Sequence, residues 1–227
     1  MSNSASKPGP AAKIPKSPKT PKPYHKGHVS QDLYSAASRL IESEGLESLT
    51  LRRLCREVGV TAANFYNHYP SVEHLLLEMA AAGMEALQAM NNRVLKRAKS
   101  RSEQLISTTV HIVDFSIEHP DLFRIMFGQV ADSEKHTRYM GAATTSFGGL
   151  VRLIYGEDIY RPDDVAWSHA HCPKAYAYFA FAYGLARLVS MRLYTFPSGT
   201  KAERQQFVKA LTLTFIQGLN LPEEPLP

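Results

Sequence analysis

The chain has 227 residues, 44% of them hydrophobic, and a formal net charge of +5, so it can bury a sizeable core in one or two domains. Its two cysteines, Cys55 and Cys172, have no C-x-x-C partner, which argues against a disulfide framework or a zinc finger and fits a reducing compartment. No apolar run approaches the roughly 18 residues of a membrane span, and the N-terminus lacks a signal-peptide apolar region. We therefore expect a soluble, cytoplasmic protein without a membrane partner.

The positive charge is concentrated at the N-terminus. Residues 1–29 contain six of the 26 Lys and Arg residues and no acid, so the other 20 basic residues are balanced by 21 acidic ones. Six prolines in this stretch prevent a helix, and its few apolar groups cannot repay the cost of ordering it. We expect residues 1–28 to form a disordered arm. It is either a solubilising tail or an arm, including Lys26, that lies along DNA phosphates and gains affinity by counterion release.

The first predicted helix spans about Val29 to Glu44, with Ser30 as its N-cap and Gly45 at its end. Its apolar residues recur at helical spacing and predict one buried face, formed by Leu33, Ala36, Ala37, Leu40 and Ile41.

The stretch from Thr50 to Tyr69 predicts two short helices joined by a tight turn. Thr50 and Thr61 are good N-cap residues, because each hydroxyl can accept from a free N–H of the first turn. Gly59 lies where the first helix must end, and glycine enters the left-handed region without steric cost. A helix, a glycine-containing turn and a second helix predict a DNA-binding helix-turn-helix, whose second helix enters the major groove.

This stretch resembles the TetR family of bacterial transcriptional regulators, through a pattern of the form T-x3-[IL]-x4-G-V-[ST]-x3-[LF]-Y-x-[HY]-[FY]. The residues that carry the resemblance are Thr50, Leu54, Gly59, Val60, Thr61, Phe65, Tyr66, His68, Tyr69, Glu73 and Leu75. The resemblance implies an all-α, TetR-like fold of about nine helices. It would have a helix-turn-helix DNA-binding domain over residues 29–72 and an effector-binding and dimerisation domain over residues 73–227.

The predicted partner is double-stranded DNA. In this motif the exposed start of the recognition helix, Ala62, Ala63 and Asn64, faces base edges, and Asn64 suits adenine. The resemblance implies a base contact from Arg52 and phosphate contacts from a further set, Thr50, Thr61, Tyr66 and His68. The alternative is that Arg52 and Asn64 are merely solvated, and that the two threonines serve only as caps.

Two departures from the family pattern bear on the operator and the effector. Val72 occupies the position of a frequent phosphate-binding lysine, and Ala62-Ala63 replaces a frequent Lys-Gly pair, so the operator sequence stays undetermined. A valine at the first of these positions also occurs in the fatty-acid biosynthesis repressors of the family, which this chain faintly resembles.

The rest of the chain predicts further helices. Ser71 is expected to cap a long fourth helix that runs to about Lys96. The later helices are expected over about Ser102–Glu118, Pro120–Phe127, Glu134–Tyr155, Asp163–Tyr194 and Lys201–Leu219. Within them, Gly148-Gly149 is expected to be a weak point, and Pro173 is expected to break or kink its helix. No stretch shows the alternation of a strand.

The body is rich in aromatic residues, which in the family enclose a small-molecule effector. The candidates for an effector site are Phe115, His119, Phe123, Phe127, Phe147, Ile154, Trp167, Tyr176, Phe179 and Tyr183. A mostly apolar pocket with a few polar groups predicts an apolar or amphipathic effector, and the faint resemblance to the fatty-acid biosynthesis repressors implies the fatty-acyl type. The alternative is that these residues are ordinary core.

A homodimer is implied by the resemblance, through a four-helix interface built from the last two helices of each subunit. The candidate interface residues are Ala182, Ala186, Ser190, Phe207, Leu211, Thr214 and Gly218. The alternative is that they lie in the core of one subunit. No metal or other cofactor is expected: His169 and His171 are two residues apart and do not share a helix face.

These patterns predict a dimeric, effector-responsive DNA-binding regulator that acts as a repressor and is released from its operator by the effector. The alternative is an effector-independent DNA-binding or architectural protein. An enzyme is not expected, because the chain shows no Ser/His/Asp order, no paired acids on one face and no phosphate-binding loop.

Overall fold

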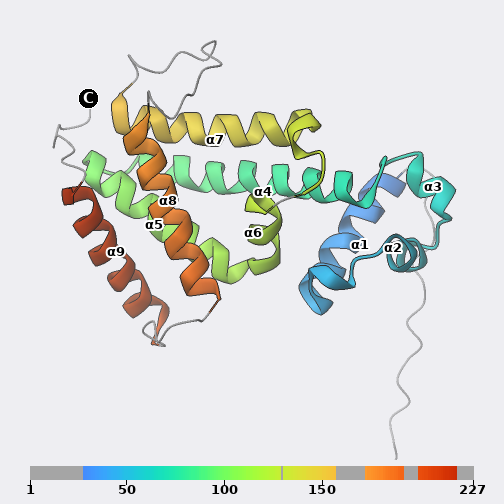
Figure 1. Ribbon diagram of the computed structural model, residues 1–227. Helices are drawn as coiled ribbons and strands as arrows, with labels where there is room; N and C mark the ends of the chain where they lie inside the picture. Colours follow the sequence, from blue (N-terminus) through green and yellow to red (C-terminus); the bar gives the residue numbers. More distant parts are fainter. Residues whose placement is uncertain (1–27, 129, 157–171, 192–198, 219–227) are drawn as a thin grey trace, which may run out of the picture.

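The computed structural model describes residues 28–128, 130–156, 172–191 and 199–218 (Figure 1). These residues form an all-α fold without strands, as expected. The helices are α1 (Val29–Glu44), α2 (Leu51–Val58), α3 (Ala62–Tyr66), α4 (Val72–Leu95), α5 (Arg101–Glu118), α6 (Pro120–Phe127), α7 (Thr137–Tyr155), α8 (Pro173–Ser190) and α9 (Lys201–Gly218), with short 3₁₀ turns η1 (Leu46–Ser48) and η2 (Ser133–Lys135). None of these helices is both long enough and apolar enough to cross a membrane. The predicted arm with Lys26, and also Trp167, lie outside the described residues.

Helices α1 to α3 form a small head at one end of the molecule (Figure 1). The predicted caps of its two short helices are confirmed. Thr50 Oγ1 accepts from the backbone N–H of Arg53, and Thr61 Oγ1 accepts from that of Asn64, each at 3.2 Å. Gly59 has φ 78° and ψ 32°, the left-handed conformation that ends α2 and turns the chain into α3.

The core of the head explains how α3 is held against α1. Phe65 is completely buried, and Tyr69 is 7% exposed. The Tyr69 hydroxyl donates to the backbone oxygen of Ser30 at 3.1 Å and lies 2.9 Å from Ser30 Oγ. The prediction that Ser30 caps α1 is therefore wrong: the N-cap is His28, without a side-chain bond. Ser30 lies inside the first turn, where its hydroxyl pairs with Tyr69.

Helix α4 leaves the head and continues through the body, where it lies beside α7 and α6 (Figure 1). Its predicted cap is confirmed, since Ser71 Oγ accepts from the His74 N–H at 3.1 Å. Gly83 permits the approach of α6, because a Cβ at this position would lie 2.7 Å from Met126 Sδ. Helix α5 lies at the centre of the body, packed against α4, α8 and α9.

Two predicted boundaries in the body need correction. The helix expected from about Glu134 begins instead at Thr137, after η2, and His136 is its N-cap through an Nδ1 that accepts from the Tyr139 N–H at 3.2 Å. The expected weak point at Gly148-Gly149 does not interrupt α7, which is continuous to Tyr155. Pro173 is the first residue of α8, where its missing N–H costs nothing.

Candidate DNA-binding surface and effector cavity

The recognition helix α3 presents small and polar residues to solvent. Thr61, Ala62 and Ala63 are exposed, and Tyr66 keeps 55% of its surface accessible. The Tyr66 ring meets the edge of Phe65, with centroids 5.5 Å apart and planes at 82°, so the buried ring orients the exposed one. Arg52 of α2 and His68 are exposed as well, so these predicted DNA-contacting residues are accessible to a duplex.

Asn64 differs from its neighbours on this face. It is half-buried, and its Oδ1 is buried without a hydrogen-bond partner among the described residues. A bidentate contact with adenine uses both the amide oxygen and the amide nitrogen. The side chain must therefore rotate before it can read a base in that way.

An ion pair that the sequence patterns did not predict joins α2 to the C-terminal end of α1. Arg53 Nη2 of α2 lies 2.7 Å from Glu44 Oε1 at the end of α1. Arg53 is thus engaged within the protein, whereas Arg52, its neighbour in sequence, is exposed. Nine residues separate the pair, so helix periodicity within either element gives no signal for it.

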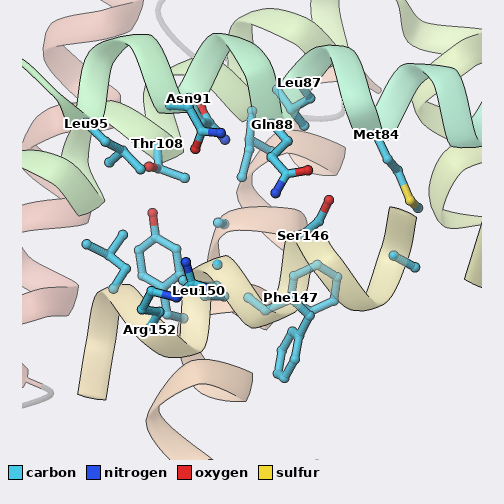
Figure 2. A pocket seen from close by; sticks show the side chains of 18 of the residues that line it. Met84, Leu87, Gln88, Asn91, Leu95, Thr108, Ser146, Phe147, Leu150 and Arg152 are labelled. Atoms are coloured by element: carbon cyan, nitrogen blue, oxygen red, sulfur yellow. The ribbon is translucent and has the colours of Figure 1, made fainter. Parts of the chain in front are cut away.

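The body contains a cavity of about 820 Å³ lined by residues of α4, α5, α6, α7 and α8 (Figure 2). Much of its wall is apolar: Met84, Leu87, Leu95, Ile112, Met126, Phe127, Phe147, Leu150, Leu153 and Phe179 are among the lining residues. A volume of this size and character is typical of small-molecule sites.

The predicted effector residues divide into three groups. Phe127, Phe147 and Phe179 line the cavity. Phe115, Phe123 and Ile154 are instead buried in the packed core, and His119 is exposed at the end of α5. Tyr176 and Tyr183 do not line the cavity but support rings that do.

These supporting contacts are ring to ring. The Tyr176 centroid lies 4.7 Å from that of Phe147, and the Tyr183 centroid lies 5.5 Å from that of Phe127. The two tyrosines therefore fix the positions of the lining rings.

Sequence reasoning missed the polar part of the wall. The polar lining residues are Gln88, Asn91 and Asn92 of α4, Arg101, Gln104 and Thr108 of α5, and Ser146 and Arg152 of α7. One helix face of α4 contains Gln88, Asn91, Asn92 and Leu95, which follow Gln88 at spacings of three, four and seven residues. This spacing was the sequence pattern that could have indicated the polar wall. A polar helix face normally faces water, so that signal was ambiguous.

Two arginines contribute to the polar part of the wall. They are Arg101 and Arg152, and none of the described lining residues is acidic. Arg101 Nε and Thr108 Oγ1 are both buried without a hydrogen-bond partner within the described part of the chain. Buried donors of this kind are normally satisfied, so a ligand with acceptor oxygens would fit here.

Comparison with known proteins identifies the family that the helix-turn-helix region matches. Residues 33–79, which cover most of the head and the start of α4, match the family model described as bacterial regulatory proteins of the tetR family. The head of this chain therefore carries the DNA-binding domain of the TetR family of bacterial regulatory proteins. Its residues Thr50 to Tyr69 are therefore the DNA-binding helix-turn-helix of that family.

Whole-chain similarity to TetR-family proteins is weaker. The nucleoid occlusion factor SlmA of Vibrio atlanticus (strain LGP32) is 31% identical over 104 residues, which make up 45% of this chain and 53% of the relative. This chain thus spans about half the length of the curated relatives it matches.

Solved structures cover more of the chain. A protein of unknown function from Rhodococcus sp. RHA1 superposes with a TM-score of 0.67 at 24% identity, over 87% of this chain and 98% of that one. A TetR/AcrR-family transcriptional regulator from Thermobifida fusca YX-ER1 gives 0.56 at 16% identity, over 81% and 96%. At these identities the shared property is the TetR-like fold.

The candidate dimer residues occupy different environments. Ala182 and Ala186 are 1% and 0% exposed, because α8 packs against α5, where Ser116 Oγ donates to the Ala186 oxygen at 3.2 Å. These two alanines therefore pack within the subunit, which is the alternative stated for them above. Ser190, Phe207 and Leu211 are half-buried, and Thr214 and Gly218 are exposed.

Both cysteines lie inside the folded chain. Cys55 and Cys172 are free and buried, and burial raises the pKa of both thiols. Both thiols are therefore protonated near neutral pH and poor nucleophiles. His169 and His171 lie outside the described residues.

Proposed function

We propose that this protein is a homodimeric TetR-family repressor that leaves its operator when a small molecule enters the body cavity. The observation that carries the proposal is the course of α4. This helix begins beside the DNA-binding head at Val72 and lines the cavity through Met84, Gln88 and Asn91. A molecule that favours one position of α4 also favours one position of the head, so effector binding and DNA binding are linked.

The proposed effector is an amphipathic anion with a long apolar part, such as a fatty-acyl carboxylate. The apolar wall matches a hydrocarbon chain, whereas Arg101, whose Nε is buried without a hydrogen-bond partner among the described residues, supplies positive charge. Guanidinium groups bind carboxylates through short, charge-assisted hydrogen bonds.

DNA contacts are proposed for the exposed face of the head. Arg52 and, after rotation, Asn64 would read bases, and Ala62 and Ala63 would contact thymine methyl groups. The backbone would be held by Thr50, Thr61, Tyr66 and His68, with Lys26 and the N-terminal arm adding counterion release. In this proposal residues 29–72 form the DNA-binding domain, and residues 73–227 form the effector-binding and dimerisation domain.

The proposed dimer interface lies on α8 and α9. Leu188, Met191 and Leu213 are large apolar residues that are 38%, 50% and 43% exposed, and Thr214 and Gly218 offer small exposed positions nearby on α9. Burying exposed apolar residues between two copies would stabilise the dimer. A twofold dimer would present two recognition helices to major-groove segments about 34–36 Å apart or a multiple of that distance.

The DNA proposal is tested by selecting bound duplexes from a random pool and measuring affinities on the selected operator. We expect Asn64→Ala to weaken operator binding while barely changing binding to random DNA. Lys→Ala changes in the arm should weaken both alike and flatten the salt dependence. Equal losses on both duplexes for all variants would contradict the assignment of base-reading residues.

The effector proposal has a matched pair of variants on α7. Gly149 lines the cavity and a Cβ there would meet nothing within 4 Å, so a leucine at this position has room for its first atom and is expected to reduce the volume of the cavity. Gly141 has the same open surroundings but is exposed and not part of the lining, so Gly141→Leu controls for the loss of a helical glycine. We expect C8 to C14 carboxylates to lower operator affinity about 5–150-fold in the wild type and in Gly141→Leu, but not in Gly149→Leu.

A second function is favoured by one observation, the similarity to the nucleoid occlusion factor SlmA. In that case the protein would bind DNA without a small-molecule effector. Operator affinity would then be the same with every compound tested, and Gly149→Leu would behave as the wild type.

A further inference from the structure

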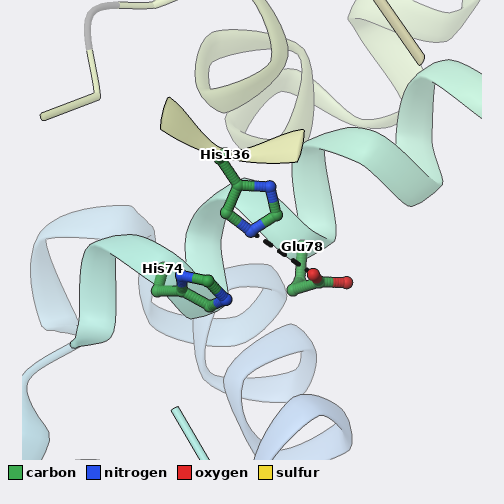
Figure 3. Close-up of side chains that lie close together, drawn as sticks. All are labelled: His74, Glu78 and His136. Atoms are coloured by element: carbon green, nitrogen blue, oxygen red, sulfur yellow. Dashed lines mark ion pairs between the residues drawn. The ribbon is translucent and has the colours of Figure 1, made fainter. Parts of the chain in front are cut away.

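Two histidines and a glutamate meet where α4 lies against the start of α7 (Figure 3). His74 and Glu78 are four residues apart on α4 and project from the same helix face. His136 reaches them from the N-cap of α7: its Nε2 lies 3.3 Å from Glu78 Oε1, and its ring centroid lies 4.3 Å from that of His74. One candidate ligand atom from each residue lies within 4.8 Å of the other two.

We propose that His74, Glu78 and His136 bind a divalent transition-metal ion. Two imidazoles and one carboxylate are a ligand set for Zn²⁺, Co²⁺, Ni²⁺ or Fe²⁺, whereas Ca²⁺ and Mg²⁺ prefer oxygen ligands throughout. Metal–ligand bonds of about 2.0–2.2 Å place neighbouring ligand atoms about 3–3.5 Å apart. The three side chains therefore need only small adjustments to reach a common ion, and water would complete its coordination.

The burial of the cluster supports a ligand-binding role. The His136 side chain is 4% exposed, and its Nε2, which faces Glu78, has no hydrogen-bond partner of good geometry among the described residues. Histidine is the commonest metal ligand in proteins, and a buried ring nitrogen without a partner is suited to that use.

Glu78 is oriented by its second oxygen. Arg138 Nη1 lies 2.6 Å from Glu78 Oε2, which leaves Oε1 directed at His136. Arg138 also contacts both carboxylate oxygens of Glu85, at 3.1 and 2.8 Å, so its own charge is compensated nearby. A hydrogen-bonded carboxylate of this kind is typical of metal sites, where outer groups hold the ligands in position.

Metal binding must change the cap of α7. Without an ion, His136 Nδ1 accepts from the Tyr139 N–H at 3.2 Å, so the proton of the neutral ring is on Nε2. An ion on Nε2 takes the place of that proton, which moves to Nδ1 and ends the bond to Tyr139. The first turn of α7 must therefore adjust, and the ion would join it to the first two turns of α4, next to the head.

The test uses the full-length, tag-free protein, stripped of metal with a chelator and titrated with Co²⁺ and then Zn²⁺. Visible absorption reports the geometry of bound Co²⁺, and calorimetry reports the affinity for Zn²⁺. We expect one ion per subunit, displacement of Co²⁺ by Zn²⁺, and a Co²⁺ spectrum of nitrogen and oxygen ligands without a thiolate band.

Two variants remove ligands with little risk to folding. His74→Gln changes a half-buried residue, and His136→Asn keeps a side chain that can cap α7 while removing Nε2. Each should lower Zn²⁺ affinity by more than the about 10–100-fold typical of losing an outer-shell partner. The controls are His111→Gln, a half-buried histidine on α5, and the pair His169→Gln/His171→Gln.

The proposal is overturned if the wild type binds neither ion stoichiometrically at micromolar concentrations. It is also overturned if both ligand variants keep wild-type affinity, or if only the His169→Gln/His171→Gln control loses it. Circular dichroism on each variant separates the loss of a ligand from the loss of the fold.

Discussion

Arg124 on α6 of the body donates from Nη2 to Glu47 Oε1 on η1 of the head, at 2.9 Å. The two residues are 77 positions apart in sequence, so the contact joins the DNA-binding unit to the body in addition to the covalent connection through α4. Arg124 also lies 3.6 Å from Asp121 on its own helix. The head is thus held to the body by a polar contact that can form or break as the head tilts.

This contact should contribute little to stability but should influence the coupling between body and head. The Glu47 side chain is 88% exposed and that of Arg124 is 40% exposed, so we expect Arg124→Glu to change the free energy of unfolding by less than about 1 kcal/mol. Repulsion between Glu47 and the new glutamate should shift the preferred head position and alter operator affinity. The reversed pair, Glu47→Arg with Arg124→Glu, should restore affinity toward the wild-type value.

Fluorescence anisotropy on the selected operator, at low and high salt, measures the operator affinity of the wild type and of the two variants. Neither Glu47 nor Arg124 is among the proposed DNA-contacting residues, so recovery in the double variant would identify their mutual contact as the cause. A double variant no better than the single one would exclude the pair as a determinant of head position.

The head was predictable from sequence because its signals are local. Thr50 and Thr61 cap helices within three residues of themselves, and Gly59 adopts the left-handed conformation expected at the end of α2. Ser30 shows the limit of such signals. It is a good cap by residue type, but a tertiary contact with Tyr69, 39 residues away, uses its hydroxyl and its backbone oxygen.

The body was less predictable because its sites depend on which helix faces meet. Aromatic residues indicated a pocket, yet Phe115 and Phe123 are core, and polar residues such as Gln88 and Thr108 contribute to the wall. Periodicity identifies a polar face but not whether water or a cavity lies opposite it. Similarly, a small residue such as Ala186 allows a close helix contact either in a dimer interface or in the core of one subunit, and the helix it contacts is α5 of the same subunit.

Tyr178 offers a test of a buried hydrogen bond between α8 and α5. Its hydroxyl donates to the Leu105 oxygen at 2.6 Å and lies 2.8 Å from Thr109 Oγ1, with the side chain 1% exposed. Burial raises the pKa of this phenol, which keeps it neutral and able to donate. Tyr178→Phe preserves the ring and should destabilise the protein by about 0.5–1.5 kcal/mol, the net value of one such bond.

Urea unfolding measures the loss, and an unchanged m-value would show that the native and denatured states keep their compactness. Tyr66→Phe is the control, because Tyr66 is 55% exposed and its substitution should stay within about 0.5 kcal/mol. Equal effects of the two substitutions would mean that the bond to Leu105 adds nothing beyond what water supplies.

His111 should make stability depend on pH. It is half-buried on α5, with Nδ1 3.2 Å from Asn91 Oδ1 of α4, and burial lowers its pKa. Attraction to Asp114 opposes this shift, and repulsion from Lys201 adds to it. In the unfolded chain the residue regains a pKa of about 6.5. The unfolded state therefore binds the proton first as pH falls.

Because the folded-state pKa of His111 is lowered, the protein should become less stable as pH falls. The stability linked to His111 is fully present above pH 6.5, the ordinary value, and is lost as pH falls from there through the lowered folded-state pKa. We expect His111→Gln to lose less stability than the wild type between pH 7.5 and pH 5.5 in urea unfolding. His119→Gln is the matched control, because His119 is exposed. Parallel pH curves for His111→Gln and the wild type would refute this linkage.

The charge of the cavity gives a prediction that separates ligand classes. Arg101 lines the cavity, and its Nε has no hydrogen-bond partner within the described part of the chain. A C10 carboxylate should therefore bind the wild type more tightly than the alcohol of equal length, because a charge-assisted bond is about twice as strong as a neutral one. Arg101→Met keeps an apolar stem of similar reach. It should lower carboxylate affinity about tenfold or more, which corresponds to the loss of about 1.5–3 kcal/mol. The affinity for the alcohol should stay nearly unchanged. Calorimetry with both ligands on both proteins measures the four affinities, and an equal loss for the alcohol would show that Arg101 shapes the cavity rather than recognising charge.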